Sequence, residues 1–231
     1  MTVETEGGYY FNKTQVYKIN DQKLTGNGFS NVVLSLKPRL YYNADKRFEM
    51  SCALGTNIPF SRTLQQVDGV TLPIDLQPST GSYGLVFQSF IIKENSFKAV
   101  RFFLATRIEK YFENKRDYLF GTLYSNSFYF SRHFVFEKMK LKDWTIILQL
   151  KNQIKEKNIR KNQTVDASGS CLFFLVPQIN LSVQEKWNIS ILTDIPVYQY
   201  YNEIQLGNTA SFAINIIRDF SFNNKPKKHV I

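Results

Sequence analysis

Hydrophobic and polar side chains alternate with a period of two along most of this chain. The clearest stretch is 173–183, in which every odd-numbered residue is apolar and the even-numbered residues include Gln178, Asn180 and Ser182. Residues 187–197 repeat the pattern, with apolar side chains at all odd positions except Thr193. Successive side chains of a β-strand point to opposite faces, so this spacing predicts strands and not helices.

About ten strands are predicted in this way, and most of them are long. They cover residues 8–19, 32–42, 48–58, 83–92, 100–111, 118–130, 144–151, 173–183, 187–197 and 211–222. Strands of soluble sheets favour about five or six residues, whereas a tilted strand needs about 9–11 residues to cross a bilayer. Length and alternation together predict an all-β fold, an antiparallel up-and-down transmembrane β-barrel of about 10–12 strands.

A soluble antiparallel barrel would alternate as well, and the two alternatives differ in which face is buried. In a membrane barrel the apolar side chains point outward to lipid. In a lipocalin-like carrier of an apolar ligand, side chains such as Ile191 would instead line an internal cavity. The membrane barrel is favoured because Gln178 and Asn180 bring no charge to the face that a soluble sheet would turn to water. Tryptophans at 144 and 187, near strand ends, also suit interfacial girdles.

The connections between the predicted strands alternate in length. Short turns are predicted at 43–46, 95–96 and 184–186, and long polar loops at 61–80 and 155–169. Bacterial barrels show this asymmetry, with tight periplasmic turns and longer external loops. No linker divides the chain, so we expect an N-terminal segment with a first strand at 1–25, a barrel at 26–222 and a basic tail at 223–231.

Composition and charge narrow the function classes. The chain of 231 residues is 43% hydrophobic and has a formal net charge of +10, with 29 Lys and Arg against 19 Asp and Glu. The basic residues are scattered, apart from a cluster at Lys225, Lys227 and Lys228, so no nucleic-acid partner is expected. No run reaches the roughly 18 apolar residues of a membrane-spanning helix, and residues 1–8 do not form a secretory signal.

Few side chains point to catalysis. The chain contains two His, His133 and His229, and two Cys, Cys52 and Cys171, all far apart in sequence. His133 has no neighbouring motif of a catalytic triad or a zinc site, and the cysteines lack the CxxC spacing. Glycine motifs that cradle phosphates are absent from the sequence. We therefore expect no enzyme activity, no cofactor and no metal.

Two motifs resemble those of a known family. The stretch Gly55-Thr-Asn-Ile-Pro59 leads into a loop that ends Leu76-Gln-Pro-Ser-Thr-Gly-Ser82, and Pro196-Val-Tyr-Gln199 is followed by Asn202 and Gln205-Leu206. In this order the motifs resemble a family of Gram-negative outer-membrane β-barrels that are loosely described as transporters. The resemblance covers about residues 26–220. It implies a place in the outer membrane and a transporter-like role.

The chain also departs from that family. Ser79 stands where the first loop has a glycine, Glu203 stands where the second motif has one, and residues 221–231 continue past the usual end. The family has further strands and a signal peptide ahead of the matching region, so we expect a truncated or recut N-terminus, or a smaller barrel. Outer-membrane insertion reads a final aromatic residue, and Phe220 at the end of the last predicted strand is the expected insertion signal.

If the chain forms such a barrel, odd and even positions sort its residues into two faces. The lumen-lining candidates are Lys37, Arg39, Glu49, Arg101, Arg107, Glu109, Gln149, Lys151, Gln178, Asn180 and Asp194. The lipid-facing candidates are Leu34, Leu36, Leu175, Ile179, Leu181, Ile189, Ile191, Ile214 and Ile216. The lumen set holds more basic than acidic residues, which would either pair across the interior or line a path for anions. Side chains nearly fill a barrel of this size, so a closed or plugged lumen is expected.

The sequence thus predicts a passive channel-like or transporter-like protein of the bacterial outer membrane. Its solute is an unidentified small molecule, or the chain is the membrane subunit of a larger assembly. Outer-membrane lipid is the expected partner, and the loops at 61–80 and 155–169 are candidate contacts for another protein. The alternative is the soluble lipocalin-like carrier.

Overall fold

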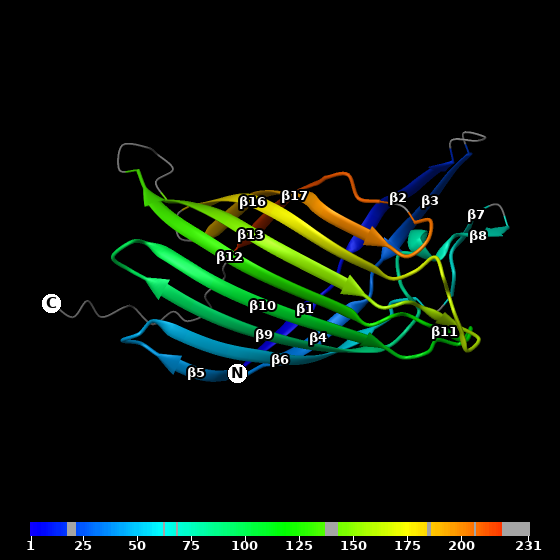
Figure 1. Ribbon diagram of the computed structural model, residues 1–231, viewed down its shortest axis with the longest axis horizontal. Coiled ribbons are helices and arrows are strands. Elements are labelled where there is room, and N and C mark those ends of the chain that lie inside the picture. Colours follow the sequence, from blue (N-terminus) through cyan, green and yellow to red (C-terminus); the bar gives the residue numbers. More distant parts are fainter. Residues whose placement is uncertain are drawn as a thin grey trace.

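One antiparallel sheet dominates the computed structural model, which describes residues 1–17, 22–61, 63–67, 69–136, 143–183, 186–205 and 207–218. In this part of the chain, eleven strands form a single sheet (Figure 1). From β4 onward, neighbours in the sheet follow one another along the chain, so the sheet is a meander. The prediction of an all-β antiparallel fold is confirmed.

Ten strands follow one another across the sheet, and one more pairs beside them. In sheet order they are β1 (Thr2–Glu6), β4 (Val32–Lys37), β6 (Phe48–Ile58), β9 (Gly84–Asn95), β10 (Val100–Tyr111), β12 (Leu123–Val135), β13 (Asp143–Lys155), β16 (Ser170–Val183), β17 (Trp187–Tyr201) and β18 (Ser211–Arg218), while β5 (Arg39–Asn43) pairs with β6. The seven strands from β6 to β17 on this path have 11 to 15 residues each. The predicted strand length is therefore observed for these seven strands, whereas the single strand predicted at 32–42 is divided into β4 and β5, of six and five residues.

Short elements occupy the long connections of the sheet. A hairpin of β2 (Tyr9–Tyr17) and β3 (Gln22–Phe29) separates β1 from β4. After β6 come β7 (Gln66–Val67), β8 (Val70–Thr71) and the 3-10 helix η1 (Ile74–Leu76). A small separate sheet contains β11 (Tyr118–Leu119), β14 (Ile159–Arg160) and β15 (Gln163–Thr164). They gather at one end of the large sheet, on the right in Figure 1, which we call the long-loop end. The described part of the chain holds no helix with the length and hydropathy needed to cross a membrane.

The opposite end of the sheet carries the short turns. Residues 44–47 join β5 to β6, and residues 96–99 join β9 to β10. Long and short connections therefore alternate along the chain, as the sequence predicts. Residues 184 and 185 of the third predicted turn lie outside the described residues, as do Phe220, the predicted insertion signal, and the tail at 223–231.

The strand predicted at 118–130 begins later, at Leu123. Tyr118 and Leu119 pair with β14 instead of joining the large sheet. Between them and β12, the chain passes directly against the backbone of Glu156, where a Cβ on Gly121 would lie 2.0 Å from the Glu156 carbonyl oxygen. This close crossing, which only glycine allows, separates the two segments.

The N-terminal segment contributes more to the sheet than the sequence analysis predicts. The acidic stretch Thr2–Glu6 forms β1 and pairs with β4. The strand predicted at 8–19 forms as β2 but pairs only with β3 among the described residues. The large sheet thus begins at β1, and the β2–β3 hairpin lies on the path between its first two strands.

The sheet curls so that one face is concave. Arg107 on β10 places Nη1 2.8 Å from Oε2 of Glu6 on β1, although β4, β6 and β9 lie between these strands. Four strand spacings of about 4.8 Å each exceed the reach of the two side chains across a flat sheet. Lys37 on β4 likewise lies 4.0 Å from the ring centroid of Phe90 on β9, two strands away. The face that carries these residues is therefore the inside of the curve.

Burial is the reverse of that expected for a sheet in water. The concave face buries many polar side chains, namely Ser35, Ser51, Asn57, Gln88, Ser127, Gln149 and Ser190. The convex face exposes large apolar ones, among them Leu34, Leu36, Leu54, Leu85, Phe87, Phe102, Leu104, Phe128, Phe130, Ile146, Leu148, Leu150, Ile179, Ile191, Ile214 and Ile216. A small apolar cluster of Leu172, Phe174 and Val176 lies on the concave side of β16. Most of the apolar surface thus faces away from the interior.

The two edges of the sheet are β1 and β18. Among the described residues, β1 pairs with β4 and β18 pairs with β17, and no backbone pairing joins β1 to β18. The fold that is established is the curled antiparallel meander.

Gly55 brings β6 and β4 into close contact on the concave side. A Cβ at this position would lie 2.7 Å from the Leu34 carbonyl oxygen and 2.7 Å from the Ser35 Cβ. We expect Gly55→Ala to lower the free energy of unfolding by about 1–3 kcal/mol, because overpacking forces the backbone to shift. Denaturant unfolding followed by circular dichroism measures the change.

Thr56→Ala is the matched control, because Thr56 is exposed on the convex face of the same strand. We expect this variant to stay within about 0.5 kcal/mol of the parent protein. Equal unfolding midpoints for the two variants would contradict the close β4–β6 packing.

Candidate functional site

The two sets of residues predicted for the barrel faces lie on opposite faces of the sheet. The predicted lumen-lining residues, from Lys37 on β4 to Asp194 on β17, share the concave face because strand register aligns them with its buried side chains. The predicted lipid-facing residues share the convex face: Leu34, Leu36, Ile179, Ile191, Ile214 and Ile216 are exposed, and Leu175, Leu181 and Ile189 are half-buried. Whether these faces contact a lumen and lipid stays a prediction.

Every charged residue of the predicted lumen set has an ionic partner. Lys37 pairs with Glu4 at 3.1 Å, Arg39 with Glu49 at 3.1 Å, Arg101 with Glu94, Arg107 with Glu6 at 2.8 Å and with Glu109 at 2.5 Å, and Lys151 with Asp194 at 2.7 Å. Glu4, Glu6 and Glu94 were not in the predicted set, and they remove its excess of basic charge. Whether these charges close an interior or line a path for anions stays a prediction.

The three additional acidic residues lie where the sequence pattern is weak. Thr2–Glu6 contains a single apolar side chain, Val3, so no hydrophobic alternation marks β1. The one feature of the sequence that indicates a strand here is the alternation of Glu4 and Glu6 with Val3 and Thr5. Glu94 lies just past residue 92, where the prediction ended the strand that the structure extends to Asn95.

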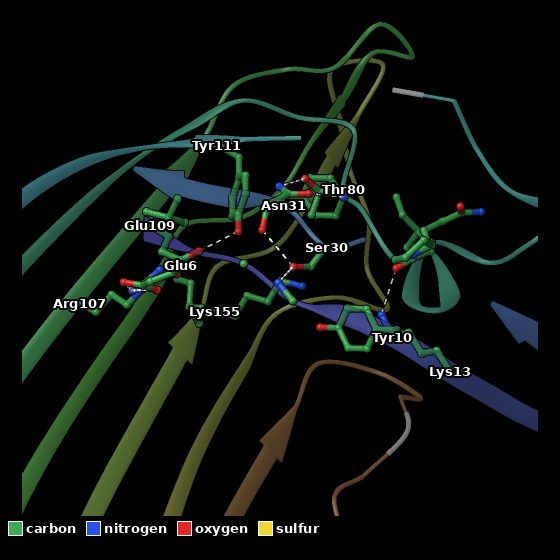
Figure 2. A pocket seen from close by; sticks show the side chains of 18 of the residues that line it. Glu6, Tyr10, Lys13, Ser30, Asn31, Thr80, Arg107, Glu109, Tyr111 and Lys155 are labelled. Atoms are coloured by element: carbon green, nitrogen blue, oxygen red, sulfur yellow. Dashed lines mark hydrogen bonds and ion pairs between the residues drawn. The ribbon is translucent and has the colours of Figure 1, made fainter. Parts of the chain in front are cut away.

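One arginine holds two carboxylates at the long-loop end of the concave face (Figure 2). Arg107 Nη1 donates to both carboxylate oxygens of Glu6, at 3.0 and 2.8 Å, and its Nε donates to Glu109 Oε1 at 2.5 Å. The Tyr111 hydroxyl donates to Glu109 Oε2 at 2.7 Å, and Gln88 Nε2 donates to Glu6 Oε1 at 3.2 Å. All four carboxylate oxygens therefore accept a hydrogen bond.

The network continues from Tyr111 into the loop between β6 and β9. Asn57 Nδ2 donates to the Tyr111 hydroxyl at 3.3 Å, and Asn31 Nδ2 donates to Asn57 Oδ1 and to Thr80 Oγ1, both at 2.7 Å. Asn31 Oδ1 in turn accepts from Ser79 Oγ at 2.8 Å and from the Thr80 backbone N–H at 3.0 Å. Ser79, where the resembling family has glycine, thus uses its hydroxyl to hold the loop.

This network forms one wall of a cavity of about 630 Å³ at the long-loop end. Its charged lining residues are Glu6, Lys13, Arg107, Glu109 and Lys155. They come from β1, β2, β10 and β13, and Figure 2 shows these elements converging around the space. Cavities of about 300–1,000 Å³ are typical of small-molecule sites.

A bulge in β2 turns Tyr10 and Lys13 toward the same cavity. Residues three apart on a regular strand point to opposite faces. Tyr10 pairs with Gly28 and Lys13 pairs with Gly26, so β2 carries one extra residue between these two pairs. Both side chains line the cavity, with Lys13 Nζ 5.2 Å from the Tyr10 ring centroid and 3.1 Å from the Gln77 carbonyl oxygen.

The cavity is lined by polar and charged side chains. Its lining offers hydrogen-bond donors, acceptors and charges, whereas His133 lies elsewhere on the concave face, with Nδ1 3.2 Å from Thr145 Oγ1 and Nε2 3.7 Å from Asp143 Oδ1. Cys52 and Cys171 are free thiols on β6 and β16. The described residues hold no group of three His, Cys, Asp or Glu side chains able to bind a metal.

Comparison with known proteins places the chain in no family. No protein-family model matches the sequence, and no curated protein matches it. The resemblance to outer-membrane barrels therefore stays a prediction.

Removal of Arg107 leaves Glu6 and Glu109 close together without their counter-charge. The Glu109 side chain that stays behind is 12% exposed, so water compensates little for its lost counter-charge. We expect Arg107→Gln to lower the free energy of unfolding by about 2 kcal/mol or more. Adding Glu6→Gln to this variant should restore part of the loss, because one uncompensated carboxylate is then removed.

Arg39→Gln is the control, since the Arg39 side chain also pairs with a glutamate but is 58% exposed. An exposed pair contributes at most about 1 kcal/mol. The same denaturant titration measures all three variants. If Arg107→Gln and Arg39→Gln lowered the free energy of unfolding equally, the Arg107 network would not stabilise the concave face.

Proposed function

We propose that this chain is an integral β-barrel of a bacterial outer membrane, with an interior closed by ion pairs and a solute-binding cavity at its long-loop end. The observation that carries the proposal is the burial of polar side chains on the concave face together with the exposure of apolar ones on the convex face. In a bilayer the exposed apolar side chains meet lipid, and paired strands satisfy the backbone. Pairing of β1 with β18 to close the sheet is part of the proposal.

The convex face is unfavourable in water. Ile146, Ile179, Ile191 and Ile214 are cross-strand neighbours in one row over β13, β16, β17 and β18, and all four are exposed. Each of these side chains is close to half exposed, so it forgoes about 1 kcal/mol of what full burial would provide. Contiguous apolar surface of this kind is typical of a face that contacts lipid or protein. The lipocalin-like alternative needs these isoleucines inside, so the burial pattern disfavours it.

Charged and aromatic residues near the strand ends support a membrane belt. Lys93, Lys110, Arg132 and Arg218 lie on the convex face, each toward one end of its strand. Tyr198 and Tyr200 are exposed near the long-loop end of β17, and Trp187 begins that strand at the other end. Basic and aromatic side chains favour the two membrane–water interfaces, whereas the apolar belt between them suits the hydrocarbon core.

The ion pairs favour a closed interior over an open pore. Arg107 reaches Glu6 across three intervening strands, and Lys151 on β13 reaches Asp194 on β17 across β16. Each pair leaves fewer unpaired charges on the concave face to line a path for ions. On this proposal the protein transports its solute passively. A solute bound in the cavity passes inward only when the ion pairs of the concave face exchange partners.

Gel mobility tests the proposal directly. A closed transmembrane barrel resists SDS until it is heated, so the full chain extracted in detergent should migrate differently before and after boiling. The protein should also leave solution when detergent is removed. A protein that stays soluble without detergent and shows one mobility in both lanes would contradict the membrane barrel.

A charge placed in the isoleucine row separates a lipid-facing surface from a water-facing one. Ile191 is 47% exposed, so Ile191→Arg would be nearly neutral in water. In a bilayer we expect it to cost about 2–4 kcal/mol of folding free energy. The measurement is the fraction of heat-modifiable protein after refolding into lipid vesicles.

Tyr200→Arg serves as the control because Tyr200 is equally exposed but lies beside the long-loop end of β17. Near the interface an arginine costs about 0–1 kcal/mol. Normal refolding of Ile191→Arg, with improved solubility in the absence of detergent, would contradict a lipid-facing row.

A further inference from the structure

We propose that the cavity at the long-loop end binds a small water-soluble anion, a carboxylate or a phosphate, with Lys155 as the principal ligand. This inference rests on the proposed function and names the class of its solute. The sequence predicts for Lys155 only a place at the start of the loop at 155–169, a candidate protein contact, and not a role in the interior. The structure places it at the end of β13, on the cavity wall below β1 (Figure 2).

The two acidic residues of the cavity share one arginine, and each of their carboxylate oxygens already accepts a hydrogen bond. Both oxygens of Glu6 accept hydrogen bonds from Arg107, and Gln88 adds a third bond to Oε1. Glu109 accepts from Arg107 and from the Tyr111 hydroxyl. A cationic solute would have to displace Arg107 from these carboxylates, so the cavity is poorly suited to cations.

Unlike these carboxylates, the Lys155 ammonium group has no charged partner among the described residues. Its side chain is half-buried in the cavity wall, and it makes no ion pair or side-chain hydrogen bond with any residue in the described ranges. An ammonium group that is partly withdrawn from water and lacks a counter-charge gains most from an anion. The other basic residues of the concave face, by contrast, have carboxylate partners, as shown by Lys37, Arg107 and Lys151.

Two residues of β2 complete the positive side of the cavity. The bulge between Tyr10 and Lys13 brings both side chains to the cavity wall. Lys13 adds a second ammonium charge there, and the Tyr10 hydroxyl makes no hydrogen bond to the described part of the chain. The lining thus carries three basic side chains, Lys13, Arg107 and Lys155, against two acidic ones. The balance favours a ligand with one negative group.

Size and position agree with a small solute. The cavity of about 630 Å³ is within the range for small molecules. It lies among the long connections, so it opens at the end of the sheet and not on its apolar convex face. A soluble anion that arrives from water at this end meets Lys155 before it reaches the inner pairs such as Lys151–Asp194.

Calorimetric titration of the full chain in uncharged detergent, with inorganic phosphate and with succinate as probes, tests the inference. We expect the parent protein to bind at least one probe, and Lys155→Met to weaken that binding by about tenfold or more, because a charge-assisted hydrogen bond is lost. Lys155→Arg should retain most of the affinity. Lys110→Met is the matched control, since Lys110 is exposed at the same end of the sheet on the convex face, and its affinity should be unchanged.

Each result can be assigned to one cause. Heat-modifiable mobility of every variant shows separately whether the barrel itself forms, so loss of binding in a correctly folded Lys155→Met protein supports the site. Equal binding by the parent and Lys155→Met proteins would overturn the proposal, as would no binding of either probe by a heat-modifiable parent protein. A parent protein that binds neither probe but binds phosphatidylglycerol added to the micelles would assign the cavity to a lipid headgroup. That result would overturn the soluble-anion proposal.

Discussion

The concave face of the sheet has to satisfy its own charges and hydrogen bonds, and the rest of the structure depends on this requirement. Curvature brings strands that are far apart in the sheet within reach, so Glu6 on β1 can meet Arg107 on β10. A buried carboxylate without a partner would destabilise the fold far more than an unpaired surface charge. The pairs therefore hold β1, which has only five residues, against the inside of the curve.

The same side chains link the closed interior to the proposed solute site. Arg107 bonds both Glu6 and Glu109, and from Glu109 the network runs through Tyr111 and Asn57 to the long-loop end. A solute in the cavity therefore lies beside the groups that keep the interior closed. On our proposal, binding and opening are coupled through one arginine, because any change in its partners affects both cavity wall and ion pairs.

The sequence predicts the faces of the strands better than their partners. Period-two alternation is sufficient to place Lys37 and Asp194 on one face and Ile191 on the other, because side-chain direction in a strand depends only on parity. Parity carries no information about which residues meet across the curve, so the partners Glu4 and Glu6 were missed. The cavity was missed for the same reason: it depends on a bulge in β2 and on loops whose packing has no periodic signal.

The proposed membrane barrel requires the convex face to contact lipid. Nitroxide labels at successive positions from Leu148 to Asn152 on β13, in a variant without Cys52 and Cys171, measure this directly in lipid vesicles. We expect labels at Leu148 and Leu150 to collide with oxygen, which dissolves in lipid, and the label at Gln149 to be shielded. Collision of the even-numbered labels with a water-soluble nickel chelate instead would place the convex face in water and contradict the membrane barrel.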